Sequence, residues 1–405
     1  ADTMNVAVGY ATLEATTTAT NNTAVGGYAL QANTTGSSNC AFGEQALVLN
    51  TTGGYNTSVG ARSLDANTTA SYNTGVGYQS LTSNTTGAYN TAIGSHVLYT
   101  NTTGEKNISI GQGSMYYNTT GDDNTCVGYI ALEANTTGSM NTAVGAYALD
   151  DNTTGSGNVA IGRHALSANT TPSDNVAVGQ GALTYNTTGS LLTAIGYNAL
   201  HNNTTASNNT ALGYEAGKNV TTGSHNTLLG YKAGYYSTAI TDGVRNVVIG
   251  DYCHTSSAGA YDQIVIGYNV IGSGHTSFTF GNSTTDTTCA YGATSWSAPS
   301  DVRLKEDIED EKVGLDFINE LRPVTYRWKK EKDVPIDLKA HGSGTEKRVM
   351  NGKYNHGFIA QEVKEVLDKN PDIKEGFDMW SEDEVDGRQR IGETALIPLL
   401  VKAIQ

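Results

Sequence analysis

The sequence NTAVGGYALQANTTGSS (residues 22–38) decides the fold, because close variants of it recur every 17 residues along most of the chain. A glycine recurs at positions 9, 26, 43, 60, 77, 94, 111, 128, 145, 162, 179, 196, 213 and 230 without a change of spacing. An asparagine stands four residues before each of these glycines, except where Leu192 replaces it. A fixed period indicates a solenoid, in which each repeat forms one coil and only neighbouring coils are in contact.

Two apolar positions recur with the same period. One is the residue before the glycine, and the other lies four residues after it. The first series begins with Val8, Val25, Phe42, Val59, Val76, Ile93, Ile110 and Val127, and the second with Leu13, Leu30, Leu47, Leu64, Leu81, Leu98, Met115 and Leu132. If each repeat contributes a short strand that stacks on the next one, each series becomes a continuous ladder. We predict that both ladders are buried.

The residue two positions before each glycine is small, as in Ala7, Ala24, Ser58, Gly75 and Cys126. A position that accepts only small side chains is crowded, and the glycine itself supplies a corner or a close backbone approach that a side chain would block. The crowding arises either inside the coil or along a threefold axis between three chains. The sequence leaves both explanations open.

The density of charged residues changes sharply near residue 299. The first 299 residues contain 22 charged side chains with a net charge of −10, and the last 106 contain 41 with a net charge of −5. Such a change marks a domain boundary. The net charge of −15 and the lack of a basic patch argue against a nucleic-acid partner. The sequence contains no run of about 18 apolar residues, so it predicts no membrane-spanning helix.

These patterns predict a mostly β protein in three parts. A β-solenoid or β-roll stalk of 17-residue repeats covers residues 1–235, an irregular β neck covers 236–299, and a small α+β domain covers 300–405. In the neck, Ile264, Ile266, Phe278 and Phe280 alternate as in strands. The stalk resembles the β-roll heads of trimeric adhesins and the repeat shafts of phage tail fibres. This resemblance implies a homotrimer, which we treat as a hypothesis.

Asn-Thr-Thr triplets recur along the stalk. They begin at Asn33, Asn50, Asn67, Asn84, Asn101, Asn118, Asn135, Asn152, Asn169, Asn186 and Asn203. The triplets match the N-glycosylation motif, and they could also bind host glycans or order water as ice-binding ladders do. We favour a structural role, because Asn and Thr before a glycine form side-chain hydrogen bonds that hold turns.

The cysteine and tyrosine residues of the chain suggest no cofactor. Cys40, Cys126, Cys253 and Cys289 fit no metal-ligand spacing, and Cys40 and Cys126 lie five repeats apart, about 24 Å at strand spacing and beyond disulfide reach. We expect small buried hydrophobic side chains instead, with no metal and no cofactor. The 23 tyrosines could pack against the sugar rings of host glycans, although tyrosines more often line the flanks of a solenoid.

The C-terminal region begins with SDVRLKEDI at Ser300 and continues with GLDFINELRPVTYRWKKE, YNHGFIAQEVKEVL and ALIPLLVKAIQ. In this order, these segments resemble the intramolecular chaperone, auto-processing domain of phage endosialidases, tailspikes and tail fibres. The resemblance covers essentially all of residues 300–405. It implies a domain that trimerises, helps the upstream fibre fold and then releases itself. The implied cleavage site lies between Pro299 and Ser300.

A Ser/Lys pair is the candidate catalytic centre. Ser300 and Lys305 lie five residues apart, a distance that a turn can close. A serine hydroxyl becomes a good nucleophile when a base takes its proton, and a lysine acts as that base when burial or nearby cations lower its pKa. Arg303 could supply such a cation, Asp301 could orient it, and His356 could position the pair or stabilise the oxyanion.

Apolar periodicity predicts the secondary structure of this domain. Leu315, Phe317, Ile318 and Leu321 predict a helix that packs into a core and ends at Pro323. A strand at 324–328 follows, then a helix that contains residues 362–367 and a final helix from Leu396 to Ile404.

Three classes of function remain. The first is a viral-type tail fibre or spike of the virion, with a single-turnover serine auto-endopeptidase and a structural stalk that is a candidate for binding host glycans. The second is a secreted bacterial or algal fibre or adhesin at the cell surface with the same chaperone. A carbohydrate-active enzyme on the stalk is the third, but no paired carboxylates stand out from the repeats.

Overall fold

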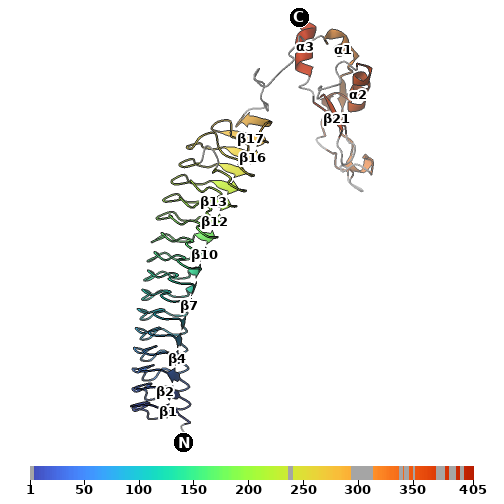
Figure 1. Ribbon diagram of the computed structural model, residues 1–405. Helices are drawn as coiled ribbons and strands as arrows, with labels where there is room; N and C mark the ends of the chain where they lie inside the picture. Colours follow the sequence, from blue (N-terminus) through green and yellow to red (C-terminus); the bar gives the residue numbers. More distant parts are fainter. Residues whose placement is uncertain are drawn as a thin grey trace. The chain divides into compact units, whose positions relative to one another are not determined.

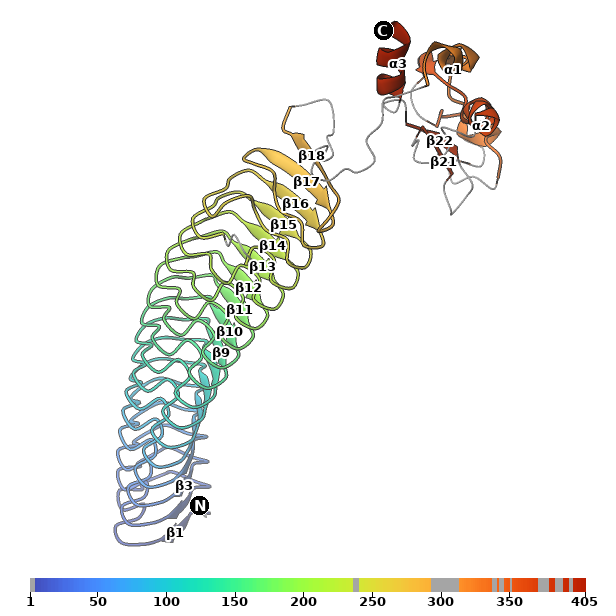
Figure 2. The ribbon, with the colours of Figure 1, turned by 45° about the horizontal axis from the view of Figure 1, so that its top comes forward.

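The structure is a computed structural model that describes residues 4–235, 240–292, 313–336, 341, 346–349, 352–370, 379–382, 389–392 and 396–405. The chain divides into two compact units, Ala1–Pro299 and Ser300–Gln405. The first unit is a β-solenoid, which we call the shaft. It is shown in Figure 1 and, turned by 45°, in Figure 2. The second unit is a small α+β domain, which is described by itself below.

One strand from each coil forms a single sheet along the solenoid. The strands are β1 (Val6–Val8), β2 (Thr23–Val25), β3 (Cys40–Phe42), β4 (Thr57–Val59), β5 (Thr74–Val76), β6 (Thr91–Ile93), β7 (Ile108–Ile110), β8 (Thr125–Val127), β9 (Thr142–Val144), β10 (Val159–Ile161), β11 (Val176–Val178), β12 (Thr193–Ile195), β13 (Thr210–Leu212), β14 (Thr227–Leu229), β15 (Val247–Ile249), β16 (Ile264–Gly267), β17 (Ser277–Gly281) and β18 (Asp286–Ala290).

Each of these strands pairs with the strand of the next coil. Strands β1–β17 are parallel and in register, so that Ala24 of β2 stands beside Ala41 of β3. Backbone hydrogen bonds continue between coils outside the sheet as well, as from Leu30 N to Ala46 O at 3.0 Å. Figure 2 shows the strands side by side along one edge of the column. The repeat period is therefore the length of one coil, which confirms the predicted β-solenoid.

The interior of the coil holds small and aliphatic side chains and asparagines. Ala24 at the middle of β2 and Leu30 on the opposite wall are both fully buried, as are their equivalents in the following coils. Asn22 and Asn33 are fully buried too. The crowding at the small-residue position therefore lies inside the coil. At Gly75, an added Cβ would lie 2.6 Å from Ser63 Oγ, which shows how little room this position has.

The prediction that both apolar ladders are buried is correct for one ladder and wrong for the other. The Leu ladder is buried, but the residues before the glycines point outward from the sheet, and Ile93 and Val127 are each 38% exposed. In a three-residue strand, the first and last side chains share one face, and the middle one takes the other. The crowded interior accepts the small middle residue, so the larger one must face outward.

We call this exposed series the outer ladder. Its members are Val8, Val25, Phe42, Val59, Val76, Ile93, Ile110, Val127, Val144, Ile161, Val178, Ile195, Leu212, Leu229, Ile249, Ile266 and Phe280.

The described residues 240–292 extend the sheet of the shaft. Strand β15 follows β14 after 20 residues instead of 17, and β16 then follows β15 after 17. The alternating residues Ile264 and Ile266 lie in β16, and Phe278 and Phe280 lie in β17. Strand β18 folds back antiparallel on β17 at the C-terminal end of the sheet.

In the described residues of the C-terminal unit, three α-helices pack around one small core. Its elements are α1 (Leu315–Glu320), β19 (Val324–Tyr326), a 3-10 helix (Glu331–Asp333), β20 (Asn355–Gly357), α2 (Ala360–Lys369), β21 (Trp380–Glu382), β22 (Gln389–Ile391) and α3 (Leu396–Ile404). The buried core consists of Phe317, Leu321, Val363, Val366, Leu367, Met379, Leu396 and Leu399. The three predicted helices are confirmed, but Leu315 is exposed, which corrects its assignment to the core.

Among the helices of the described residues, none is long and apolar enough to cross a membrane.

Candidate functional site

The proposed catalytic pair lies outside the described residues. The scissile bond between Pro299 and Ser300, the nucleophile Ser300 and the base Lys305 all fall within residues 293–312, as do Asp301 and Arg303. Of the residues selected from the sequence, the structure describes His356.

His356 lies in the middle of β20, opposite Thr325 of the antiparallel strand β19. Its Nδ1 is 3.5 Å from the hydroxyl oxygen of Thr325, and both side chains are exposed. Because the side chain of His356 is exposed on one face of this two-stranded sheet, another segment of the chain can reach it. The described residues therefore leave open the accessory role that the sequence suggested for His356.

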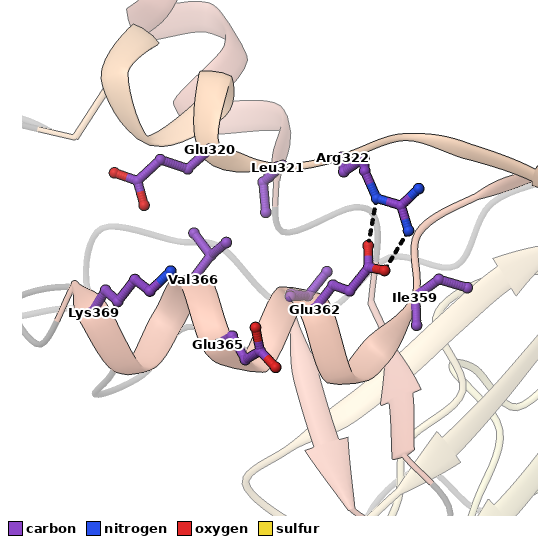
Figure 3. A pocket seen from close by; sticks show the side chains of 9 residues that line it. Glu320, Leu321, Arg322, Ile359, Glu362, Glu365, Val366 and Lys369 are labelled. Atoms are coloured by element: carbon purple, nitrogen blue, oxygen red, sulfur yellow. Dashed lines mark hydrogen bonds and ion pairs between the residues drawn. The ribbon is translucent and has the colours of Figure 1, made fainter.

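An arginine–glutamate pair links the segment after α1 to α2, beside a small hollow of the C-terminal unit. Arg322, two residues after the end of α1, donates from Nε to Glu362 Oε2 of α2 at 2.9 Å, and its Nη2 donates to the other carboxylate oxygen. Figure 3 shows the two contacts. These hydrogen bonds hold the pKa of Glu362 below its ordinary value and raise that of Arg322. The pair is largely exposed, so it orients α1 against α2 more than it stabilises the fold.

The hollow beside this pair has a volume of about 170 Å³. It is lined by Glu320, Leu321, Arg322, Ile359, Glu362, Val363, Glu365, Val366 and Lys369, from α1, α2 and the segments next to them (Figure 3). Pockets that enclose a drug-sized ligand usually measure about 300–1,000 Å³. The hollow is therefore too small for a glycan substrate.

The Asn-Thr-Thr triplets form an internal hydrogen-bond ladder. Asn67 donates from Nδ2 to Oδ1 of Asn50 in the preceding coil at 2.8 Å and to the carbonyl oxygen of Ala70 at 3.0 Å. The first threonine of the triplet donates from its hydroxyl to a carbonyl of the next coil, as Thr68 does to Thr85. All eleven triplet asparagines are fully buried. The structural role favoured from the sequence is thus confirmed.

Tyrosine side chains stack along the surface of the shaft. The rings of Tyr55, Tyr72 and Tyr89 are almost parallel, with centroids 5.0 and 5.1 Å apart, and Tyr197, Tyr214 and Tyr231 form a similar column. A sugar ring packs on the face of an aromatic ring. Because a ring inside such a column has neighbours on both faces, it offers only its edge to a glycan.

None of the four cysteines, all within the described residues, forms a disulfide. Cys126 and Cys253 are buried as expected, whereas Cys40 and Cys289 are half-buried. Burial raises the pKa of the Cys40, Cys126 and Cys253 thiols above the ordinary range. These thiols therefore behave as packing groups.

Comparison with known families identifies the C-terminal region. Residues 300–370 match the model of a family described as "chaperone of endosialidase". No curated protein and no solved structure matches the chain. The match covers the segments that contain Ser300, Lys305, Arg322, His356 and Glu362.

The chain is thus a β-solenoid shaft followed in sequence by a chaperone-of-endosialidase domain. This architecture fits a protein of the tail-fibre type. The family implies a self-cleaving domain of the serine peptidase type, and it is associated with phage tail fibres and spikes.

Proposed function

We propose that this protein is a viral tail fibre or spike component whose C-terminal domain assembles three copies, helps the shaft to fold and then cuts itself off. The observation that carries the proposal is the family match, which begins at Ser300. The boundary between the two compact units falls at the same place, between Pro299 and Ser300. Cleavage there would separate the whole solenoid from the whole C-terminal unit.

The chemistry requires one nucleophile and one base. The hydroxyl oxygen of Ser300 attacks the carbonyl carbon of Pro299, and Lys305 accepts the hydroxyl proton. The peptide bond breaks, its nitrogen takes up a proton, and an ester links Pro299 to the Ser300 oxygen. Water then hydrolyses the ester, which leaves a carboxylate at Pro299 and a free amine at Ser300. Asp301, Arg303 and His356 are accessory groups in this scheme.

A separate assembly domain suits the topology of the shaft. Every strand pairs with a strand about 17 residues away, but no local signal distinguishes one coil from the next, because the repeats are so alike. Repetitive parallel pairing of this kind folds slowly and exposes strand edges to wrong partners. A domain that holds three chains together at one end starts the coils in register. Its later removal makes unfolding effectively irreversible.

The test compares the full chain with its Ser300→Ala variant by intact mass and native mass. We expect the unchanged chain to yield a fragment that begins at Ser300, and the variant to remain whole, with both forming trimers. Ser297→Ala, three residues upstream, is the matched control and should be cleaved like the unchanged chain. A folded, trimeric and uncleaved Ser300 chain would show that the domain assembles fibres without cutting them. A monomeric chain would refute the assembly role.

The accessory role of His356 has its own readout. His356→Ala should slow cleavage without changing the native mass, because the side chain is exposed and lies outside the core. Equal cleavage rates for His356→Ala and the unchanged chain would remove His356 from the scheme.

A further inference from the structure

We infer that the sheet face of the shaft, centred on the outer ladder, is the surface on which the shafts of further copies of this chain pack. This inference rests on the proposed assembly of several copies, and it names the surface that they use. The outer ladder is apolar at all 17 positions and runs along the entire sheet. Ten of its members, among them Ile93, Val127 and Ile195, are 37–57% exposed, and the other seven are half-buried.

The chemistry of this face differs from that of the remaining surface. None of the strands β1–β16, all within the described residues, contains a charged side chain. The first position of each strand, on the same face, is Thr, Val, Ile or Cys. The net charge of the shaft is therefore carried by the other faces of the coil. A continuous apolar strip that avoids charge over so many repeats marks an interaction surface.

The area of the strip is sufficient for a stable contact. An aliphatic side chain carries about 100 Å² of apolar surface, so 17 side chains that are roughly one third exposed on average present on the order of 500 Å². Each partner in a standard protein interface contributes roughly 800 Å². The half-exposed side chains at the first strand position, such as Thr142 and Val159, add to the strip. Together they reach the size that a specific interface needs.

The period of the strip favours another copy as the partner. Successive ladder side chains stand one strand spacing apart, about 4.8 Å, over the whole stack of coils. A second copy presents the same side chains at the same spacing, so each coil of one shaft meets a coil of the other. A globular partner of unrelated sequence would match only a few coils. Copies held in register at the C-terminal end would also be aligned at every coil.

The experiment uses the full chain with Ser300→Ala, so that the C-terminal unit stays attached, and with three ladder residues replaced, Ile93→Glu, Val127→Glu and Ile195→Glu. The unchanged chain in this comparison carries Ser300→Ala alone. The matched control places Glu at Thr86, Thr120 and Thr188, which are exposed and lie seven residues before the ladder positions. Native mass gives the number of copies, and the cross-sectional radius from small-angle X-ray scattering distinguishes packed shafts from splayed ones. We expect packed trimers for the unchanged chain and the control, and splayed trimers for the ladder variant.

The outcomes separate this inference from the assembly function. Monomers of the unchanged chain would refute the proposed assembly, and the inference with it. Trimers with splayed shafts in the unchanged chain would refute the inference alone, and so would packed shafts in the ladder variant.

The Glu substitutions could also unfold the shaft, so a milder triple variant controls for this effect. Ile93→Thr, Val127→Thr and Ile195→Thr together keep β-branched side chains, which suit a strand, and remove apolar surface. With Ser300 intact, so that cleavage releases the shafts, this variant should keep the circular dichroism spectrum of the unchanged chain. Its trimers should dissociate on dilution at a higher protein concentration than those of the unchanged chain. Dissociation at the same concentration as the unchanged chain would overturn the inference.

Discussion

Asn50 donates a hydrogen bond from Nδ2 to Oδ1 of Asn33, one coil earlier, at 2.9 Å, and both side chains are fully buried. The same Nδ2 also donates to the carbonyl oxygen of Gly53 at 2.9 Å. Each amide thus closes a turn within its own coil and joins the preceding coil at the same time. A buried polar group is stable only when it has such partners.

Asn101→Ala should therefore break the ladder near the middle of the shaft. Asn84 Oδ1 loses the donor that Asn101 supplies. Gly104 O keeps the hydrogen bond from Asn90, and Asn118 keeps its hydrogen bond to Gly121 O. A buried group left without a partner costs about 1–3 kcal/mol, so we expect the variant to lose about 1–3 kcal/mol of local stability. Hydrogen exchange of the backbone amides of β6 and β7 measures this loss of stability locally, because a repeat protein need not unfold as one unit.

The control for this variant lies in the same triplet. Thr103 is exposed, so Thr103→Ala should change the stability by less than about 0.5 kcal/mol. Similar exchange rates in the two variants would contradict a structural role of the asparagine ladder.

Burial of the triplets also predicts where glycans are absent. The triplet asparagines, such as Asn101, have no exposed surface, but the motifs at Asn21 and Asn208 present exposed side chains. If the chain is produced in a host that glycosylates proteins, the folded fraction should carry glycans only at exposed motifs. Peptide mass spectrometry of the folded protein checks this. A glycan on Asn101 in correctly folded protein would contradict the observed packing.

The sequence was sufficient to predict the coils, but not which side of each strand faces inward. The 17-residue period shows which residues share a column, and Leu30 was correctly placed in the core. Val25 was wrongly placed there, because apolar character alone does not show how much room the coil has. Leu192 is an apolar residue at a position where the repeat otherwise has asparagine, and the sequence alone does not show that this position is inside the coil. It occupies a buried asparagine position, and its N–H still donates to Asn175 Oδ1 at 3.0 Å.

In the C-terminal unit, local periodicity predicted the helices, but it could not reveal contacts between distant segments. Arg322 and Glu362 are 40 residues apart, and neither the LRP nor the AQEV segment indicates the other as its partner. The backbone conformation of the shaft also could not be predicted from local patterns. Leu30 has a φ of 49° in its turn, a conformation that a leucine rarely adopts and that no pattern of side chains predicts.

Two adjacent glycines should respond in opposite ways to the same substitution. Gly26 has a φ of 135°, and a Cβ there would lie 2.4 Å from the carbonyl oxygen of Gly43 in the next coil. At Gly27 a Cβ would meet nothing within 4 Å. We expect Gly26→Ala to destabilise the adjacent coils by about 3 kcal/mol or more. Gly27→Ala should be neutral or stabilising by up to about 1 kcal/mol.

Hydrogen exchange of β1, β2 and β3 distinguishes the two glycine variants. Faster exchange should appear in Gly26→Ala only. If both variants exchange alike, the coils do not approach each other as closely as the structure shows.

The acidic residues Glu133 and Asp150 make part of the shaft more stable at lower pH. Burial raises the pKa of Asp150 above its ordinary value, and the nearby Asp151 adds to the effect. Glu133 is raised by burial and by both aspartates. Since the folded state binds these protons more readily than the unfolded state, their charges destabilise the shaft above the raised pKa values. This destabilisation is relieved as the pH falls toward the ordinary carboxyl range, near 4.

Asp150→Asn should thus stabilise the shaft at pH 7 and have little effect near pH 4. An asparagine still offers an oxygen to the hydroxyl of Ser167, which donates to Asp150 at 2.6 Å. The gain should be less than about 1 kcal/mol, because the side chain is only half-buried. Asp262→Asn is the contrasting control: hydrogen bonds from Arg245 lower the pKa of Asp262, so its loss should slightly weaken the shaft at pH 7. Melting temperatures between pH 4 and 7 test both, and parallel curves for Asp150→Asn and the unchanged chain would show that the acidic cluster does not affect folding.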